Sequence, residues 1–229
     1  MRYYIQNLIV FTAIALTIIF SYLSVSFTPQ DTQPLDPITT ACDSNLLLLE
    51  TGGVASIENR YLRTVVREKM QTAANLVCAS AQLFAADPES QGSALLPFRF
   101  SAHAEYHTHK RTRSVRVQFY EETGGAHGNI DYYTQTVTTR NDPVTLTDLL
   151  SSHAISEDDF IRMVTEDLTV SGDIPFLTPF SSIDQAQHWH ITDRGVLTVT
   201  FPPYALAPYS YGTLEATVDL TSQSAANGT

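Results

Sequence analysis

The chain has 229 residues and a formal net charge of −11, from 24 acidic and 13 basic side chains. This charge excludes a protein that holds nucleic acid or an anionic lipid surface by electrostatic attraction, because both ligands are themselves negative. It favours a basic protein as a partner, although many exported domains are acidic only for solubility.

The first 27 residues contain one arginine, no acidic residue and an apolar run that ends at Phe27. A run of about 20 apolar residues can cross a bilayer, while the small residues Ser24-Val25-Ser26 suit cleavage of a secretory signal peptide. The flanking charges predict a cytoplasmic N-terminus and export of everything after Phe27. We therefore expect a signal anchor or signal peptide at residues 1–27, membrane contact through residues 5–27 if it is uncleaved, and an extracytoplasmic, periplasmic location.

Prolines mark the next segment as an extended linker. Residues 28–41 contain Pro29, Pro34 and Pro37 and few hydrophobic side chains, which suits a spacer better than a packed element. Residues 42–221 are then long enough to form one domain with its own core, and residues 222–229 form a polar tail. The exported part carries a formal charge of −12, because residues 1–27 hold a single charge.

Both cysteines, Cys42 and Cys78, lie in the exported part. In an oxidising compartment an even pair predicts a disulfide, and closing a loop of this length contributes roughly 3 to 4 kcal/mol to stability. A lipid-modified Cys42 is the alternative. It is disfavoured because Thr39-Thr40-Ala41 lacks the expected apolar lead-in.

Hydrophobic periodicity predicts an α+β fold, with an antiparallel sheet packed against two main helices and an N-terminal hydrophobic helix before them. Helical spacing predicts a long helix over residues 56–86. A second helix follows Ser156-Glu157-Asp158-Asp159, which has the spacing of a capping box with Asp159 in place of the usual Glu. Alternating or apolar runs predict strands over 98–109, 188–191, 196–201 and 214–220, a hairpin of two strands within 115–138, and a short strand running into a helical turn over 144–150.

Histidines follow one face of the strand predicted at 98–109. His103, His107 and His109 alternate with apolar residues, and imidazole is a common ligand for zinc and copper; His127 would be the natural fourth ligand. Residues two apart on a strand are separated by roughly 7 Å, so three such ligands rarely close around one ion. We predict a solvated polar face without metal or cofactor. The alternative is a peptidoglycan-acting hydrolase or deacetylase with a His-based metal site.

Two segments are candidates for ligand binding. The first is the turn Thr123–Gly128, where Gly124, Gly125 and Gly128 surround His127 and expose backbone for close approach. The second is a proline-braced loop that carries Tyr204, Pro208, Tyr209 and Tyr211. Aromatic side chains on preorganised backbone supply contact area at a small entropic cost. The alternative is an ordinary glycine-rich turn, with tyrosines that only close the end of the core.

The order of these features resembles the extracytoplasmic domain of RsiV-like anti-sigma factors. The residues that carry the resemblance are Gly124-Gly125-Ala126-His127-Gly128, the segment Val144 to Leu150, and the segment Gly195 to Gly212. The same domain precedes the catalytic domain of some peptidoglycan deacetylases. The resemblance covers about Phe98 to Leu220 and implies a compact α+β domain; in the anti-sigma members this domain is a lysozyme receptor.

The chain also departs from these relatives. Only about seven residues precede the hydrophobic run, so we do not expect a segment that binds a sigma factor, and we do not expect a deacetylase domain. What remains is a binding module, whose expected partner is a basic wall-active protein such as lysozyme, or the cell-wall glycan. A structural envelope protein without a discrete ligand is the remaining alternative.

Overall fold

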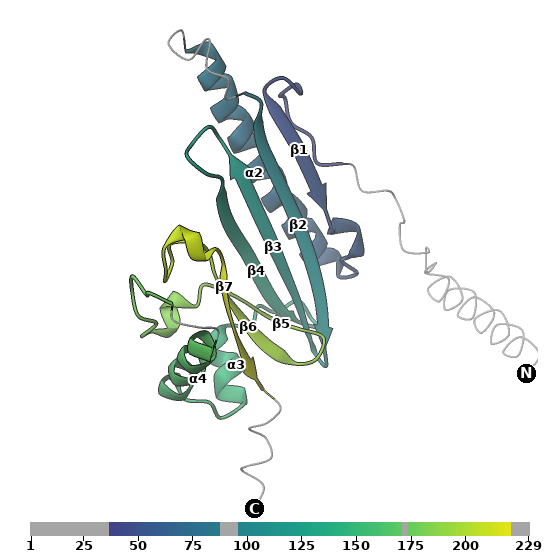
Figure 1. The fold of residues 1–229 in the computed structure, drawn as a ribbon. Helices are drawn as coiled ribbons and strands as arrows, with labels where there is room; N and C mark the ends of the chain where they lie inside the picture. Colours follow the sequence, from purple (N-terminus) through teal and green to yellow (C-terminus); the bar gives the residue numbers. More distant parts are fainter. Residues whose placement is uncertain (1–36, 88–95, 171–173, 221–229) are drawn as a thin grey trace, which may run out of the picture. The chain divides into compact units, whose positions relative to one another are not determined.

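A computed structural model describes residues 37–87, 96–170 and 174–220 of the chain (Figure 1). The predicted N-terminal hydrophobic helix and the polar tail lie outside these residues. No helix in the described ranges is long and apolar enough to cross a membrane. Residues 37–229 form one compact unit, and its described part confirms the predicted α+β class with three α-helices and two sheets. The helices are α2 (Arg60–Ala86), α3 (Leu146–Ser152) and α4 (Glu157–Val170).

The first sheet, sheet A, contains the predicted hairpin. Its strands in spatial order are β1 (Leu47–Gly52), β2 (Phe98–His109), β3 (Thr112–Glu122) and β4 (Asn129–Thr138). β3 and β4 pair in antiparallel fashion with Val117 opposite Tyr133. The sequence analysis did not assign β1, which runs parallel to β2. Parallel strands need a long crossover, and here the crossover contains α2.

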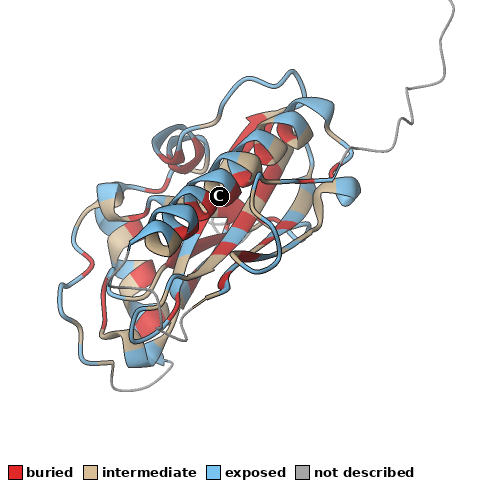
Figure 2. Cartoon of the chain, turned by 90° about the horizontal axis from the view of Figure 1, so that it is seen from above, coloured by how far each residue is buried: buried red, intermediate tan, exposed pale blue. Residues whose placement is uncertain are grey.

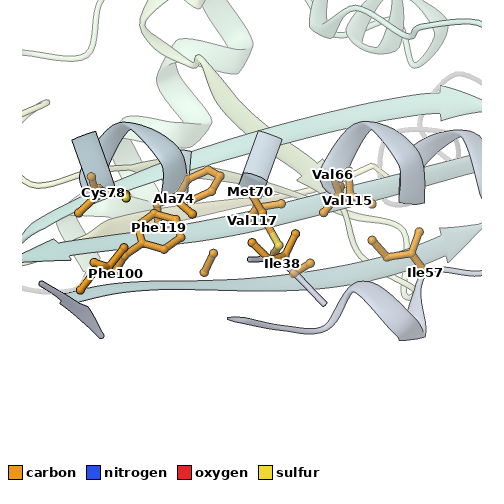
Figure 3. Packing of buried hydrophobic residues seen from close by; sticks show 14 of the residues in the cluster. Ile38, Ile57, Val66, Met70, Ala74, Cys78, Phe100, Val115, Val117 and Phe119 are labelled. Carbon is orange, nitrogen blue, oxygen red and sulfur yellow. The ribbon is translucent and has the colours of Figure 1, made fainter. Parts of the chain in front are cut away.

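One face of sheet A packs against α2. The helix buries residues at intervals of three and four, including Val66, Met70 and Ala74, and these lie against Val115, Val117 and Phe119 of β3 (Figure 3). Exposed residues occupy the outer sides of the helices and strands (Figure 2). α2 begins at Arg60, later than the predicted residue 56, because the Asn59 side chain accepts the N–H of Leu62 and caps the helix there.

The segment before β1 is attached to α2. A disulfide joins Cys42 to Cys78, 36 residues apart. Ile38, within the predicted linker, is 8% exposed and belongs to the same core. The packed unit therefore begins before residue 42, because the apolar Ile38 side chain is buried against it.

The second sheet, sheet B, is antiparallel and packs against α3 and α4. Its strands in spatial order are β5 (His188–Ile191), β6 (Val196–Phe201) and β7 (Leu214–Asp219). Phe160 and Val164 of α4 share a core with Phe201 of β6. The predicted cap of α4 is confirmed, since the Asp159 N–H donates to Ser156 Oγ at 3.1 Å.

The segment predicted as a short strand and helical turn is mostly helix. Pro143 forms a single β-bridge with Val137, and Thr145 then caps α3 by accepting the N–H of Asp148. Proline has no N–H to extend a ladder, so the strand stops at that bridge.

Polar groups join the two sheets. The N–H groups of Trp189 and Ile191 on β5 donate to the hydroxyls of Thr134 and Ser114 on sheet A, at 3.0 and 3.2 Å. The solvated face predicted for β2 is therefore wrong at His107, whose ring stacks on that of His190 with a centroid distance of 5.0 Å. Alternation along β2 predicted the polar face, but not that β5 would cover part of it.

Candidate functional site

The glycine turn and the tyrosine loop meet in space. His127, in the turn between β3 and β4, stacks on Tyr209, with ring centroids 3.7 Å apart and ring planes inclined by 21°. Tyr204 lies beside the same imidazole, with a centroid distance of 6.1 Å and ring planes inclined by 41°. We call His127, Tyr204 and Tyr209 the aromatic cluster; it unites residues 77 to 82 positions apart in the sequence.

Hydrogen bonds fix the orientation of these rings. His127 Nδ1 lies 3.0 Å from the carbonyl oxygen of Gly128 and must donate to it, because a carbonyl only accepts. In the neutral imidazole Nε2 is then an acceptor, and the Tyr204 hydroxyl, 3.4 Å away, donates to it. The Tyr209 hydroxyl donates to the same Gly128 carbonyl at 2.8 Å. The carbonyl oxygen of Gly128 thus accepts hydrogen bonds from both the glycine turn and the tyrosine loop.

Gly128 leaves room for the ring of Tyr120. A Cβ atom at position 128 would lie 2.3 Å from the Tyr120 ring, closer than side chains pack. Gly124 has a φ of +85°, a backbone conformation that favours glycine. A Cβ at Gly125, in contrast, would meet nothing nearer than 3.6 Å. Two of the three predicted glycines therefore have a structural reason, and the third does not.

The tyrosine loop is held by a buried anchor and a tight turn. Leu206 is 1% exposed, and its carbonyl accepts the N–H of Leu177 at 2.7 Å. Tyr204 has a φ of +70°, unusual for a residue with a side chain, and its N–H bonds to the carbonyl of Ala207. Its side chain is nevertheless 58% exposed. The loop therefore presents a ring to solvent on a constrained backbone.

Pro208 and Tyr211 lie at the edges of the cluster. Pro208 precedes the short helix η3 (Tyr209–Tyr211) and accepts the N–H of Tyr211 through its carbonyl. Tyr211 is 44% exposed, and the structure gives it no ring contact with the cluster. The structure therefore gathers three of the predicted aromatic residues and places the fourth beside them.

The sequence analysis missed a hollow beside the cluster, which is lined by residues of β1, β2 and β3. It has a volume of about 510 Å³. Tyr120 lines it and also covers Gly128, so the hollow and the glycine turn share one side chain. Its other lining residues are Leu48, Leu49, Glu50, Arg99, Phe100 and Ser101. The apolar run Leu46–Leu49 was the available signal, but that strand was not assigned.

Carboxylates surround the glycine turn. Burial, and then the negative charge of Asp131, raise the pKa of Glu121 above its ordinary value. Glu122 is partly neutralised by Arg99, 3.8 Å away at an exposed position. His188 Nε2 lies 3.7 Å from Asp131 Oδ1, but burial lowers the pKa of this histidine more than Asp131 raises it. The turn therefore has a negative environment at neutral pH.

The histidines considered as metal ligands are not brought together. His107 stacks on His190 between the sheets, and His109 Nδ1 bonds to the carbonyl of Asp193. His103 lies in the middle of β2 and is exposed, while His127 belongs to the aromatic cluster. No group of three His, Cys, Asp or Glu side chains within the described ranges could hold a metal ion. The chemistry that the cluster offers is stacking and hydrogen bonding.

Comparison with known proteins gives a family match without an assigned function. Residues 154–221 match the model of the DUF3298 family, described as protein of unknown function; the matched segment includes the tyrosine loop and excludes the glycine turn. No curated protein matches the chain. A crystal structure of a DUF3298 member from Bacteroides fragilis is 14% identical and has a TM-score of 0.42, with 73% of this chain and 69% of that one covered. A DUF3298 family protein from Pseudomonas aeruginosa is 17% identical and has a TM-score of 0.37, with 64% and 66% covered.

Proposed function

We propose that the exported part of this chain is an RsiV-like binding module of the bacterial cell envelope, which recognises a basic wall-active protein such as lysozyme. The observation that carries the proposal is the stack of His127 on Tyr209, with ring centroids 3.7 Å apart. This stack joins the glycine turn and the tyrosine loop, which the sequence analysis treated as two separate candidates.

The aromatic cluster suits recognition because it is fixed before a partner arrives. The Gly128 carbonyl binds both the His127 ring and the Tyr209 hydroxyl, so these rings lose little conformational freedom on binding. Tyr204 is 58% exposed and is therefore accessible to a partner. Tyrosines of this kind are common anchors of protein interfaces.

The charge near the cluster supports a basic partner. Three carboxylates, those of Glu121, Glu122 and Asp131, flank the glycine turn. Arg99 forms an ion pair with Glu122 and so partly offsets this negative charge. An arginine of a partner could stack on Tyr204 while its charge is balanced by these carboxylates. A cell-wall glycan is the second ligand that we consider, since tyrosine rings also stack on sugars, but a neutral glycan gains nothing from the carboxylates.

The location across the membrane is also part of the proposal. It rests on the apolar run that ends at Phe27 and on the Cys42–Cys78 disulfide. Disulfides persist in oxidising compartments outside the cytoplasm.

Binding of residues 28–229 to immobilised hen lysozyme in 50 mM and 300 mM salt tests the proposal. We expect retention that weakens at high salt, and at least a tenfold loss of affinity for Tyr204→Ala. The control is Tyr61→Ala on α2, a tyrosine that is 39% exposed and lies far from the cluster in the sequence. Absence of retention at low salt would contradict a protein ligand, and co-sedimentation with purified peptidoglycan would then test the glycan.

A further inference from the structure

A second hollow, independent of the aromatic cluster, lies under the turn between β2 and β3. Its volume is about 220 Å³. Leu149 of α3, Ile191 of β5 and Leu220 after β7 line it, and each of these side chains is at most 5% exposed. The inner part of this hollow is therefore apolar. We call it the hairpin pocket.

The wall of the hairpin pocket is built by a close approach of two turns. Gly195 has a φ of +80°, and a Cβ there would lie 2.6 Å from the His109 ring. The absence of a side chain at Gly195 lets this ring close one side of the pocket. His109 Nδ1 is held 3.2 Å from the Asp193 carbonyl oxygen. The wall is thus defined by packing and by a hydrogen bond.

The rim of the hairpin pocket is basic, although the chain as a whole has a charge of −11. Lys110 and Arg111 are exposed and line the pocket, and neither forms an ion pair with any described residue. Among the described residues, no acidic side chain lines it. The neighbouring carboxylate of Asp193 is already engaged, since it accepts the Thr108 N–H at 2.6 Å and lies 3.6 Å from His107 Nδ1.

Two imidazoles complete the polar part of the pocket. His109 Nδ1 donates to the Asp193 carbonyl, and His153 Nδ1 donates to the Leu149 carbonyl at 2.9 Å, because carbonyl oxygens only accept. The structure gives the Nε2 atom of neither ring a hydrogen-bond partner among the described residues. Each Nε2 atom is therefore not engaged by another described residue.

We propose that the hairpin pocket binds a small monocarboxylate with an apolar body, such as a medium-chain fatty acid. The apolar floor takes the hydrocarbon, and Lys110 and Arg111 pair with the carboxylate at the rim. The size is adequate, because a dry protein cavity of about 150 Å³ already accepts benzene. The carboxylate of the ligand then supplies the acidic partner that these two bases lack among the described residues.

Titration of ¹⁵N-labelled residues 28–229 with octanoate, followed by amide chemical shifts, tests this proposal. This fragment contains the whole compact unit. We expect saturable shifts at Lys110, Thr112 and Gly195, and at least tenfold weaker binding of 1-octanol, octylamine and acetate, which lack either the negative charge or the apolar body.

A charge-reversed variant gives the second arm. Lys110→Glu combined with Arg111→Glu changes two exposed side chains and should weaken octanoate binding at least tenfold while the melting temperature stays unchanged. The matched control is Arg60→Glu, at an exposed position on α2, which should bind as the unmodified chain does. The proposal is overturned if octanoate does not bind, if octanol binds equally well, if the shifts lie outside the pocket, or if the charge-reversed variant retains its affinity.

Discussion

Gly128 illustrates how a single residue can hold an aromatic cluster together. Its carbonyl receives hydrogen bonds from His127 and Tyr209, and the absence of a side chain leaves room for the Tyr120 ring. The carbonyl group of Gly128 and the absence of its side chain thus both shape the aromatic cluster. Gly125 in the same turn is less constrained by its neighbours, which makes a matched comparison possible.

We predict that Gly128→Ala destabilises the unit and Gly125→Ala does not. The new methyl group at position 128 would lie 2.3 Å from Tyr120, whereas at position 125 the nearest atom is 3.6 Å away. Overpacking of this kind costs about 1 to 3 kcal/mol. Urea unfolding of the two variants measures it, and equal losses in both would contradict the prediction.

Glu121 is a second residue whose environment is unfavourable for stability. Burial and Asp131 raise the pKa of its carboxyl group, so the folded state holds the proton to a higher pH than the unfolded chain does. The stability of the unmodified protein therefore falls as pH rises from the unfolded pKa through the folded one.

We predict that Glu121→Gln is more stable than the unmodified chain at pH 7, and that this advantage disappears below the ordinary pKa of a glutamate. Urea midpoints of both proteins at pH 4 and pH 7 give the comparison. An advantage that is the same at both values, or a loss of stability at pH 7, would show that charge is not the cause.

At the scale of elements, α2 anchors the segment that precedes β1. Asn59 caps its first turn, one side is buried against sheet A, and Cys78 joins it to Cys42. The crossover through α2 also brings β1 beside β2 in parallel. The disulfide closes a long loop over this helix, so it restricts the unfolded chain more than a short-range link would.

We predict that Cys42→Ala combined with Cys78→Ala lowers the free energy of unfolding by about 3 kcal/mol, because closing a loop of this length removes chain entropy from the unfolded state. Urea denaturation measures the loss. A reducing agent should lower the stability of the unmodified protein to a similar extent and leave the double variant unchanged; an effect of reductant on the double variant would point to another cause.

At the scale of the whole compact unit, two apolar cores are joined by polar groups between the sheets. His190 of β5 is 3% exposed there, and it faces His107 of β2 and Arg116 of β3. Arg116 is also paired with Glu105 and Glu215. Burial, and then the positive environment from His107 and Arg116, lower the pKa of His190 to about 4.

We predict that this histidine makes the unit sensitive to acid. Since the unfolded chain binds its proton near pH 6.5 and the folded one near pH 4, the stability is fully present above pH 6.5 and is lost as pH falls toward 4. The contribution is about 3 kcal/mol at most. His190→Gln should reduce the fall in stability between these values, whereas His103→Gln, at an exposed position on β2, should not. Equal pH profiles of the three proteins would contradict the assignment.

Local patterns in the sequence determined most of the elements. Alternation predicted β2 and the hairpin of β3 and β4, apolar runs predicted the three strands of sheet B, and helical spacing and capping residues predicted α2 and α4. These signals are readable because they depend on neighbours within a few residues along the chain. The pairing of Cys42 with Cys78 followed from there being only two cysteines.

Contacts between distant residues were decided only by the tertiary structure. The parallel pairing of β1, the cover that β5 places over His107, and the hairpin pocket each join segments far apart in the chain. The meeting of His127 with Tyr204 spans 77 residues. Periodicity shows which side of an element is apolar, but it does not show which other element covers that side, so the sequence identified the parts of the aromatic cluster and only the fold joined them.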